Sequence, residues 1–228
     1  MEENNKIFYN FPICLLEDFH ENTTGVLSDL LDYCVYSHNL KVNDIEKTQR
    51  YLQVDILNKE AVLKSGEKLY YEHQKEPMTG VEKNIYWSFL KTNKTDFEKD
   101  CFLAFCAIKS IIGDSAYCKI TDNFIVSRMA GLVRIADEKN QIPERLQKYW
   151  RDKKGNNYHL TKLKNALQID WSLSYYSNHT RGGYYSFRLD LETLILHAEE
   201  KRGSYKENEL KKRKEEALKS ALSRLKPP

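Results

Sequence analysis

The side chains best suited to recognition chemistry lie at residues 158–169. If this stretch forms a helix, Leu160, Leu163 and Leu167 fall on one side and face the core. The other side carries polar residues, namely Tyr158, Thr161, Lys162 and Asn165, with His159 and Lys164 at its margins. Asparagine can form two hydrogen bonds with adenine, lysine can reach guanine or phosphate, and threonine can contact base edges or the DNA backbone. These residue types predict a helix that contacts nucleic acid, and the alternative is the solvated face of an ordinary helix.

Two segments of alternating hydrophobicity follow at residues 171–190 and predict a β-hairpin. Large hydrophobic residues occupy every second position at Trp171, Leu173 and Tyr175. A similar alternation follows after Gly182 and Gly183. The expected tip of the hairpin is polar and consists of Asn178, His179, Thr180 and Arg181. An arginine at such a tip can enter a minor groove or bind phosphate. The hairpin is also rich in tyrosine, which suits a protein–protein interface equally well.

The densest basic run precedes this region. Its members are Arg145, Lys148, Arg151, Lys153 and Lys154. Pro143 is expected to open a short helix that carries them, because proline is favourable in the first turn. Cations on that helix, Arg151 among them, could position phosphates or could form a plain solvated face. Either 143–153 or 158–169 is therefore a candidate for the recognition helix.

Charge is unevenly distributed along the chain. Residues 1–100 hold 12 basic and 18 acidic side chains, whereas residues 101–190 hold 14 basic and 8 acidic ones. Residues 191–228 hold 10 basic and 7 acidic side chains. A positive excess confined to one part of a chain points to a polyanionic partner such as duplex DNA. Ordinary scatter of surface charge is the alternative.

The composition is that of a globular cytoplasmic protein. A hydrophobic fraction of 41% can form a core, and a charged fraction of 30% keeps the surface solvated. No run of 18 apolar residues occurs, so we expect no contact with a membrane, and the N-terminus lacks the basic segment of a signal peptide. The five cysteines are an odd number without framework spacing and are expected to be reduced.

Helices are expected to build most of the molecule. Apolar residues at three- and four-residue spacing predict helices at 25–40, 44–56, 58–75 and 79–92, which form a helical N-terminal unit at residues 1–92. Residues 95–112 are the most apolar helix, with a capping box between Thr95 and Glu98 and with Gly113 at its end. After a short loop, residues 119–131 form a helix that Thr121 or Asp122 can cap.

The chain contains, in this order, the segment FLAFCAIKSIIG, the segment KITDNFIVSRMAG and the predicted hairpin. This order resembles that of winged helix-turn-helix DNA-binding proteins of bacterial plasmids, phages and other mobile elements. The resemblance covers about residues 95–190, with an insertion at 132–157. It implies a winged-helix-like module at 93–202 in a non-enzymatic transcriptional regulator or replication-control factor. That protein would bind duplex DNA through the 158–169 helix and the wing at 171–190, and it could be a homodimer. The alternative is a helical protein–protein interaction module that binds no nucleic acid.

C-terminal helices are expected to close the chain. Asp190 can cap a helix that Gly203 breaks, and residues 203–228 then hold a separate charged helix. The predicted fold class is therefore mainly α, with a helical N-terminal unit, a winged-helix module containing one β-hairpin, and C-terminal helices.

Residue spacing gives little support to metal binding or catalysis. Cys34 and His38 lie four residues apart on one helix face, but a structural zinc site needs two more ligands and no Cys-x-x-Cys occurs. Gly-x-Ser-x-Gly, glycine-rich phosphate loops and His-Glu-x-x-His are also missing from the sequence. We therefore expect no metal, no cofactor and no enzymatic activity; an enzyme whose site is assembled only by the fold is the remaining hypothesis.

Overall fold

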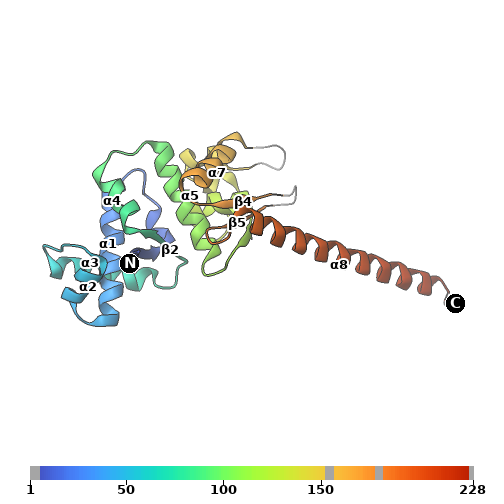
Figure 1. The fold of residues 1–228 in the computed structure, drawn as a ribbon, viewed down its shortest axis with the longest axis horizontal. Helices are drawn as coiled ribbons and strands as arrows, with labels where there is room; N and C mark the ends of the chain where they lie inside the picture. The colour runs from blue at the N-terminus through green and yellow to red at the C-terminus, as the bar shows by residue number, and fades with distance from the viewer. Residues whose placement is uncertain (1–5, 152–156, 178–181, 226–228) are drawn as a thin grey trace.

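The computed structural model describes residues 6–151, 157–177 and 182–225, apart from the side chains of 205, 206, 209 and 217–225. The described chain is mainly helical, as the sequence predicted. It forms a body from which one long helix projects (Figure 1). None of the described helices combines the length and apolar character needed to span a membrane.

The N-terminal half combines helices with a two-stranded sheet. Helices α1 (Thr23–Val42), α2 (Ile45–Leu52) and α3 (Lys59–His73) follow the 3₁₀ turn Ile13–Leu16. Each helix begins at a residue whose side chain accepts backbone N–H bonds, respectively Asn22, Asp44 and Asn58. Strand β1 (Phe8–Pro12) pairs antiparallel with β2 (Met78–Glu82), and α4 (Lys83–Lys91) follows directly.

Strand β2 corrects the prediction of a helix from Thr79. Val81 is buried opposite Tyr9, and the hydroxyl of Thr79 donates to the carbonyl of Cys106 at 2.9 Å. Alternating β-branched residues fit a half-buried strand, and pairing with β1 satisfies their backbone groups. The helix therefore begins only at Lys83.

Helix α5 (Asp96–Ile112) is the centre of the molecule. The predicted capping box between Thr95 and Glu98 is confirmed, and residues 100–108 are buried without interruption. Gly113 follows the helix with φ of 56°, a conformation that glycine adopts without a steric penalty. One cluster of buried apolar residues runs through both halves of the chain, from Tyr9 to Tyr185, so residues 1–92 and 93–202 share a core.

The elements after α5 form a small sheet with helices beside it. In chain order they are β3 (Cys118–Ile120), α6 (Asp122–Met129), two 3₁₀ turns (Lys139–Gln141 and Glu144–Tyr149), α7 (Tyr158–Asp170), β4 (Ser174–Tyr176) and β5 (Gly183–Ser186). The sheet order is β3-β5-β4, with both pairs antiparallel. The predicted hairpin is confirmed, but β3 was expected to be loop and helix start; its pairing with β5 explains the difference.

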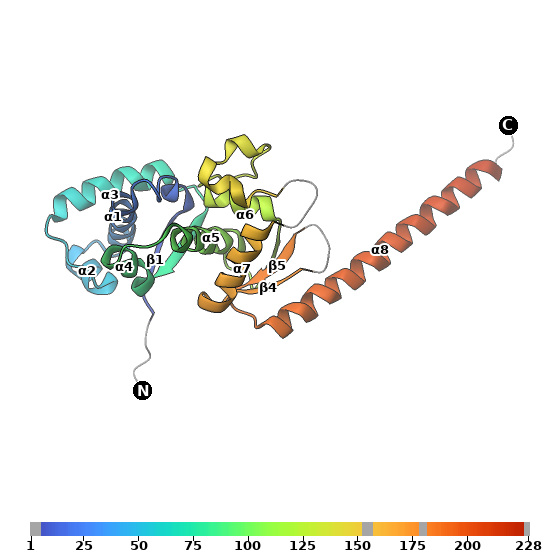
Figure 2. The ribbon, with the colours of Figure 1, turned by 90° about the horizontal axis from the view of Figure 1, so that it is seen from above.

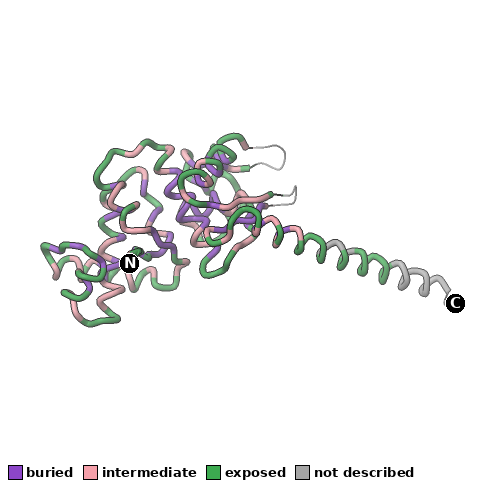
Figure 3. The backbone as a smooth tube through the Cα atoms, in the orientation of Figure 1, coloured by how far each residue is buried: buried purple, intermediate pink, exposed green. Residues whose placement is uncertain are grey.

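Helix α8 (Leu191–Leu225) is continuous, so the predicted break at Gly203 is wrong. A glycine in an exposed helix interior costs about 1 kcal/mol relative to alanine, which weakens a helix without ending it. The backbone N–H of Thr193 donates to Asp190 at 2.8 Å, as expected for a capping residue. Figures 1 and 2 show α8 leaving the body beside β4 and β5, and Figure 3 shows that burial ends soon after it leaves.

Candidate nucleic-acid interface

Helix α7 is fixed to the body at its start and along its apolar side. The side chain of Asn157 accepts from the Leu160 N–H at 3.1 Å, and its amide donates at 2.9 Å to the carbonyls of Lys148 and Trp150. Leu160, Leu163 and Leu167 are buried, as the sequence predicted. Figure 2 shows α7 next to α5, with β4 and β5 beside it. Residues on the side of α7 opposite these leucines are exposed, so that side is turned away from the core.

Four of the predicted contact residues share that outer side. Tyr158, Thr161, Lys162 and Asn165 are all exposed, and we refer to these four as the α7 face. The Lys162 ammonium lies 4.8 Å from the ring centroid of Phe97, which holds the cation at the surface beside α5. The Thr161 hydroxyl donates to the carbonyl of Asn157 at 3.0 Å, so its oxygen can still accept a hydrogen bond.

Lys164 does not belong to this face, which corrects the prediction. Only 7% of its side chain is exposed, and its ammonium donates to Asp122 at 2.6 Å. The same nitrogen lies 4.6 Å from the ring centroid of Tyr175 and 3.4 Å from the hydroxyl oxygen of that residue. Lys164 is placed at the margin of the helix, where it turns inward because Asp122 supplies a largely buried carboxylate partner with 12% of its side chain exposed.

Arg151 is half-exposed and meets the same carboxylate from the other side. Its guanidinium donates to Asp122 at 3.0 Å. Its backbone N–H donates to Asn123 at 2.9 Å, and the Asn123 amide donates back to the Arg151 carbonyl at 3.1 Å. Asp122 therefore ties α6, α7 and the end of the 132–151 segment together, and one of its two cations remains near solvent.

A second carboxylate, Asp100, was missed by the sequence reasoning. It is fully buried in α5, with His20 Nε2 2.9 Å away, the Lys148 ammonium 2.9 Å away and the Tyr149 hydroxyl 2.7 Å away. Arg145 lies 3.8 Å from it. Burial raises the pKa of Asp100, but hydrogen bonds from His20, Lys148 and Tyr149 lower it more, so the net pKa lies below the ordinary value. The only signal in the sequence was a carboxylate directly beside the apolar run of the most apolar helix.

This network gives the described part of the 143–153 run, through residue 151, a structural role. Pro143 precedes a 3₁₀ turn at Glu144–Tyr149, in place of the expected longer helix, and Lys153 lies outside the described residues. Arg145 and Lys148 are directed at Asp100, so they are partly neutralised in place. Of the two candidates for the recognition helix, α7 is the one that presents a regular, exposed polar side.

The hairpin tyrosines pack against the body. Tyr184 and Tyr185 are buried, and Tyr175 and Tyr176 are half-buried. Burial raises the pKa of Tyr185 well above its ordinary value. The Tyr176 hydroxyl donates to Glu199 of α8 at 2.8 Å, which links the hairpin to the start of that helix. The other two predicted contact residues, His179 and Arg181, lie outside the described residues.

The described residues include no cluster of three or more histidine, cysteine, aspartate or glutamate side chains placed to hold a metal ion. Cys34 and His38 do not converge: the Cys34 thiol donates to the carbonyl of Asn10, whereas His38 lies 3.2 Å from the Thr48 hydroxyl. Burial raises the pKa of the Cys34 thiol, which suits a core residue more than a metal ligand.

Comparison of this chain with protein-family models, curated proteins and solved structures found no match.

Proposed function

We propose that this protein binds duplex DNA through the α7 face, as a transcriptional regulator or replication-control factor without enzymatic activity. The observation that carries the proposal is the order helix, strand, helix, helix, strand, strand from α5 to β5, with the sheet order β3-β5-β4. That order places an exposed polar helix beside a hairpin, which is the arrangement expected of a winged-helix module. A cytoplasmic location follows from this function.

The shape of α7 suits a major groove. A helix with its side chains is about 10–12 Å across, and the major groove of B-form DNA is about 12 Å wide. Tyr158, Lys162 and Asn165 follow one another along the outer side, so all three can face the same groove. The exposed Asn165 amide is suited to adenine, and the Lys162 ammonium is suited to guanine or phosphate.

Arg151 and Thr161 support this contact from its edge. The half-exposed Arg151 guanidinium keeps donors directed at solvent beside the start of α7, where it can bind phosphate. Phosphate contacts of this kind fix the position of a protein on the duplex, while base contacts select the sequence. Modules of this class commonly bind as dimers to two half-sites, and we extend the proposal to a homodimer on DNA.

A protein–protein contact at the same surface is the second candidate, and one observation favours it. Ile169 is 82% exposed and Tyr158 is 72% exposed, and both lie on the outer side of α7. On DNA, these apolar groups would contact thymine methyl groups or sugars. On a protein partner they would be anchors at the centre of an interface. The buried and half-buried hairpin tyrosines do not favour either candidate.

Binding of the full chain to a random-sequence duplex, followed by fluorescence anisotropy at about 50 and 200 mM salt, tests the proposal. We expect binding at the lower salt concentration and a steep loss of affinity at the higher one, because bound phosphates release counterions. The variant Lys162→Ala/Asn165→Ala should bind at least about ten-fold more weakly. The matched control is Lys64→Ala/Gln74→Ala, two exposed positions at α3.

Absence of duplex binding at about 50 mM salt would refute the proposal, since even non-specific DNA-binding proteins bind under that condition. Equal losses in the α7 variant and its control would show that overall charge matters and that the α7 face does not. Sedimentation with and without duplex measures whether one or two copies bind.

A further inference from the structure

Helix α8 has two parts with different surroundings. In the first part, Leu194 and Ala198 are fully buried against Tyr184, and the Lys201 ammonium lies 4.7 Å from the ring centroid of Tyr117. From residue 203 onward every described side chain up to 216 is exposed. We call residues 203–225 the α8 arm. Figures 1 and 2 show it extending away from the body in both views.

The described side chains of the arm are not packed against the body in the way that normally stabilises a helix. Most helical stability in proteins comes from an apolar side buried against other elements, and isolated helices are marginal in water. Within 203–216, the described part of the arm offers a single large apolar side chain, Leu210, which is 56% exposed. An exposed, mainly polar helix of this length is expected to gain its stability from a partner.

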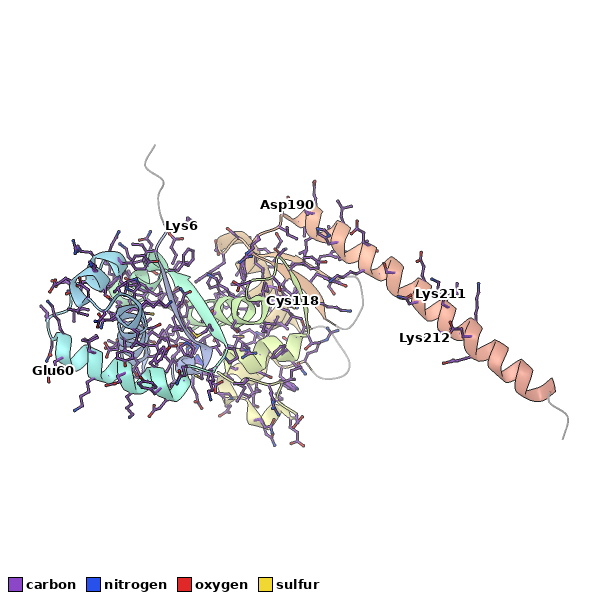
Figure 4. The ribbon with its side chains drawn as sticks, turned by 90° about the horizontal axis from the view of Figure 1, so that it is seen from below. Lys6, Glu60, Cys118, Asp190, Lys211 and Lys212 are labelled. Atoms are coloured by element: carbon purple, nitrogen blue, oxygen red, sulfur yellow. The ribbon has the colours of Figure 1, made fainter. Side chains whose placement is uncertain are left out.

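The charge of the arm indicates what that partner is. Residues 203–225 hold seven basic and four acidic side chains. Four cations are consecutive at Lys211, Lys212, Arg213 and Lys214, and successive helix positions are separated by about 100°, so they surround the helix. Figure 4 shows Lys211 and Lys212 projecting from the arm beyond the body. Lys212 lies about 21 Å along the helix from the buried Ala198, at 1.5 Å per residue.

We propose that the α8 arm is a second DNA-binding element, which holds the phosphate backbone of a duplex through Lys211, Lys212 and Lys214. Cations on all sides of an exposed helix can contact the phosphates of a polyanion. Such contacts do not require a particular base sequence. The first part of α8, which carries the arm, packs on β4 and β5, and these strands lie beside α7, so one body connects both elements. This inference extends the proposed function with a second contact for the same ligand, but it depends on α8 alone.

The test variant is Lys211→Gln/Lys212→Gln/Lys214→Gln in the full chain. Glutamine and lysine have similar helix propensities, so circular dichroism should show an intact helix. We expect affinity for a random-sequence duplex to fall at least about ten-fold at about 100 mM salt. The slope of log affinity against log salt should decrease by about 2–3, since each lost phosphate contact removes about 0.9.

The matched control removes the same charge elsewhere. Lys41→Gln/Lys64→Gln/Lys68→Gln neutralises three exposed lysines of α1 and α3. This control should keep the salt slope of the unmodified chain. A slope reduced equally by both triple variants would overturn the proposal, because net charge alone would then explain the effect. An arm variant with an unchanged salt slope would also overturn the proposal, even if its oligomeric state in sedimentation had changed.

Each of the two proposals can be refuted independently of the other. If the arm variant loses affinity while Lys162→Ala/Asn165→Ala binds normally, the arm proposal stands and the α7 proposal is wrong. If the α7 variant loses affinity and the arm variant keeps its slope, the α7 proposal stands and the arm proposal is wrong. If the unmodified chain binds no duplex at about 50 mM salt, both are wrong.

Discussion

Two carboxylates hold the segment between α6 and α7, and they do so in different ways. Asp100 lies inside α5 and is fully buried, with His20, Lys148 and Tyr149 within 2.9 Å. Asp122 is the first residue of α6, and 12% of its side chain is exposed to solvent. It binds the buried ammonium of Lys164 and the half-exposed guanidinium of Arg151.

Asp100 and its partners stabilise the fold, whereas Asp122 and its partners position the candidate interface. Asp100 joins the loop before α1 to the 3₁₀ turn at Glu144–Tyr149, so elements far apart in sequence depend on it. Asp122 joins α6 to α7 and sets the direction in which the α7 face is turned. Loss of Asp100 should therefore affect the whole molecule, whereas loss of a partner of Asp122 should affect α7 first.

The substitution Asp100→Ala should have the largest effect. It leaves His20, Lys148 and the Tyr149 hydroxyl around an empty buried position, and breaking a buried charged network usually costs about 3–5 kcal/mol. Urea unfolding measures this loss of stability. Asp55→Ala, at an exposed position, is the control and should change stability by less than about 0.5 kcal/mol. A loss below about 1 kcal/mol for Asp100→Ala would show that the network does not stabilise the fold.

A fall in pH should weaken the same network to a smaller extent, because protonation removes the charge of Asp100 but leaves its hydrogen bonds possible. The pKa of Asp100 is lower in the folded chain than its ordinary value, so its stabilising contribution is complete above about pH 4, the unfolded value. The contribution is lost as pH falls further, through the folded pKa. The difference in stability between the unmodified chain and Asp100→Ala, measured by urea unfolding, should therefore become smaller as pH is lowered below about 4. A constant difference from pH 6 to pH 2 would contradict this.

Two lysines on α7 provide the next comparison. Lys164→Ala should cost about 2 kcal/mol, because it removes the buried cation from a largely buried Asp122 and leaves the half-exposed Arg151 as the other described cation on that carboxylate. Lys162→Ala should change stability by less than about 0.5 kcal/mol, since its ammonium is exposed and contacts the face of the Phe97 ring. Thermal and urea unfolding of both variants measure the contrast. Similar stabilities would mean that Lys164 does not anchor α7.

Local signals allowed much of the fold to be predicted. The spacing of Leu160, Leu163 and Leu167 identified the buried side of α7, and Thr95 and Glu98 marked the start of α5. Strand β3 was missed because three residues carry too little periodicity, and its pairing with β5 is a contact between residues more than sixty positions apart. The prediction that Gly203 ends a helix was wrong, because a single glycine lowers helix stability without ending the helix.

The candidate site was predictable only where it depends on a single helix. Positions on α7 follow from a regular 100° rotation, so the exposure of Tyr158, Lys162 and Asn165 could be inferred from the sequence. The orientation of Lys164 depends on Asp122, which is 42 positions earlier in the chain. Asp100 likewise finds its partners at His20 and Lys148 through tertiary packing, and no local pattern contains that information.

The smallest effect expected from the Asp100 network separates its hydrogen bonds from its charges. Tyr149→Phe removes one hydroxyl that donates to Asp100 at 2.7 Å while keeping the buried ring. A hydrogen bond to a charged group contributes about 1.5–3 kcal/mol, and the loss should lie near the lower value because Lys148 donates to the same carboxylate oxygen. Tyr158→Phe removes an exposed hydroxyl and should change stability by less than about 0.5 kcal/mol. Equal stabilities of the two variants would show that the cations alone hold Asp100, and the network would then resemble that of Asp122.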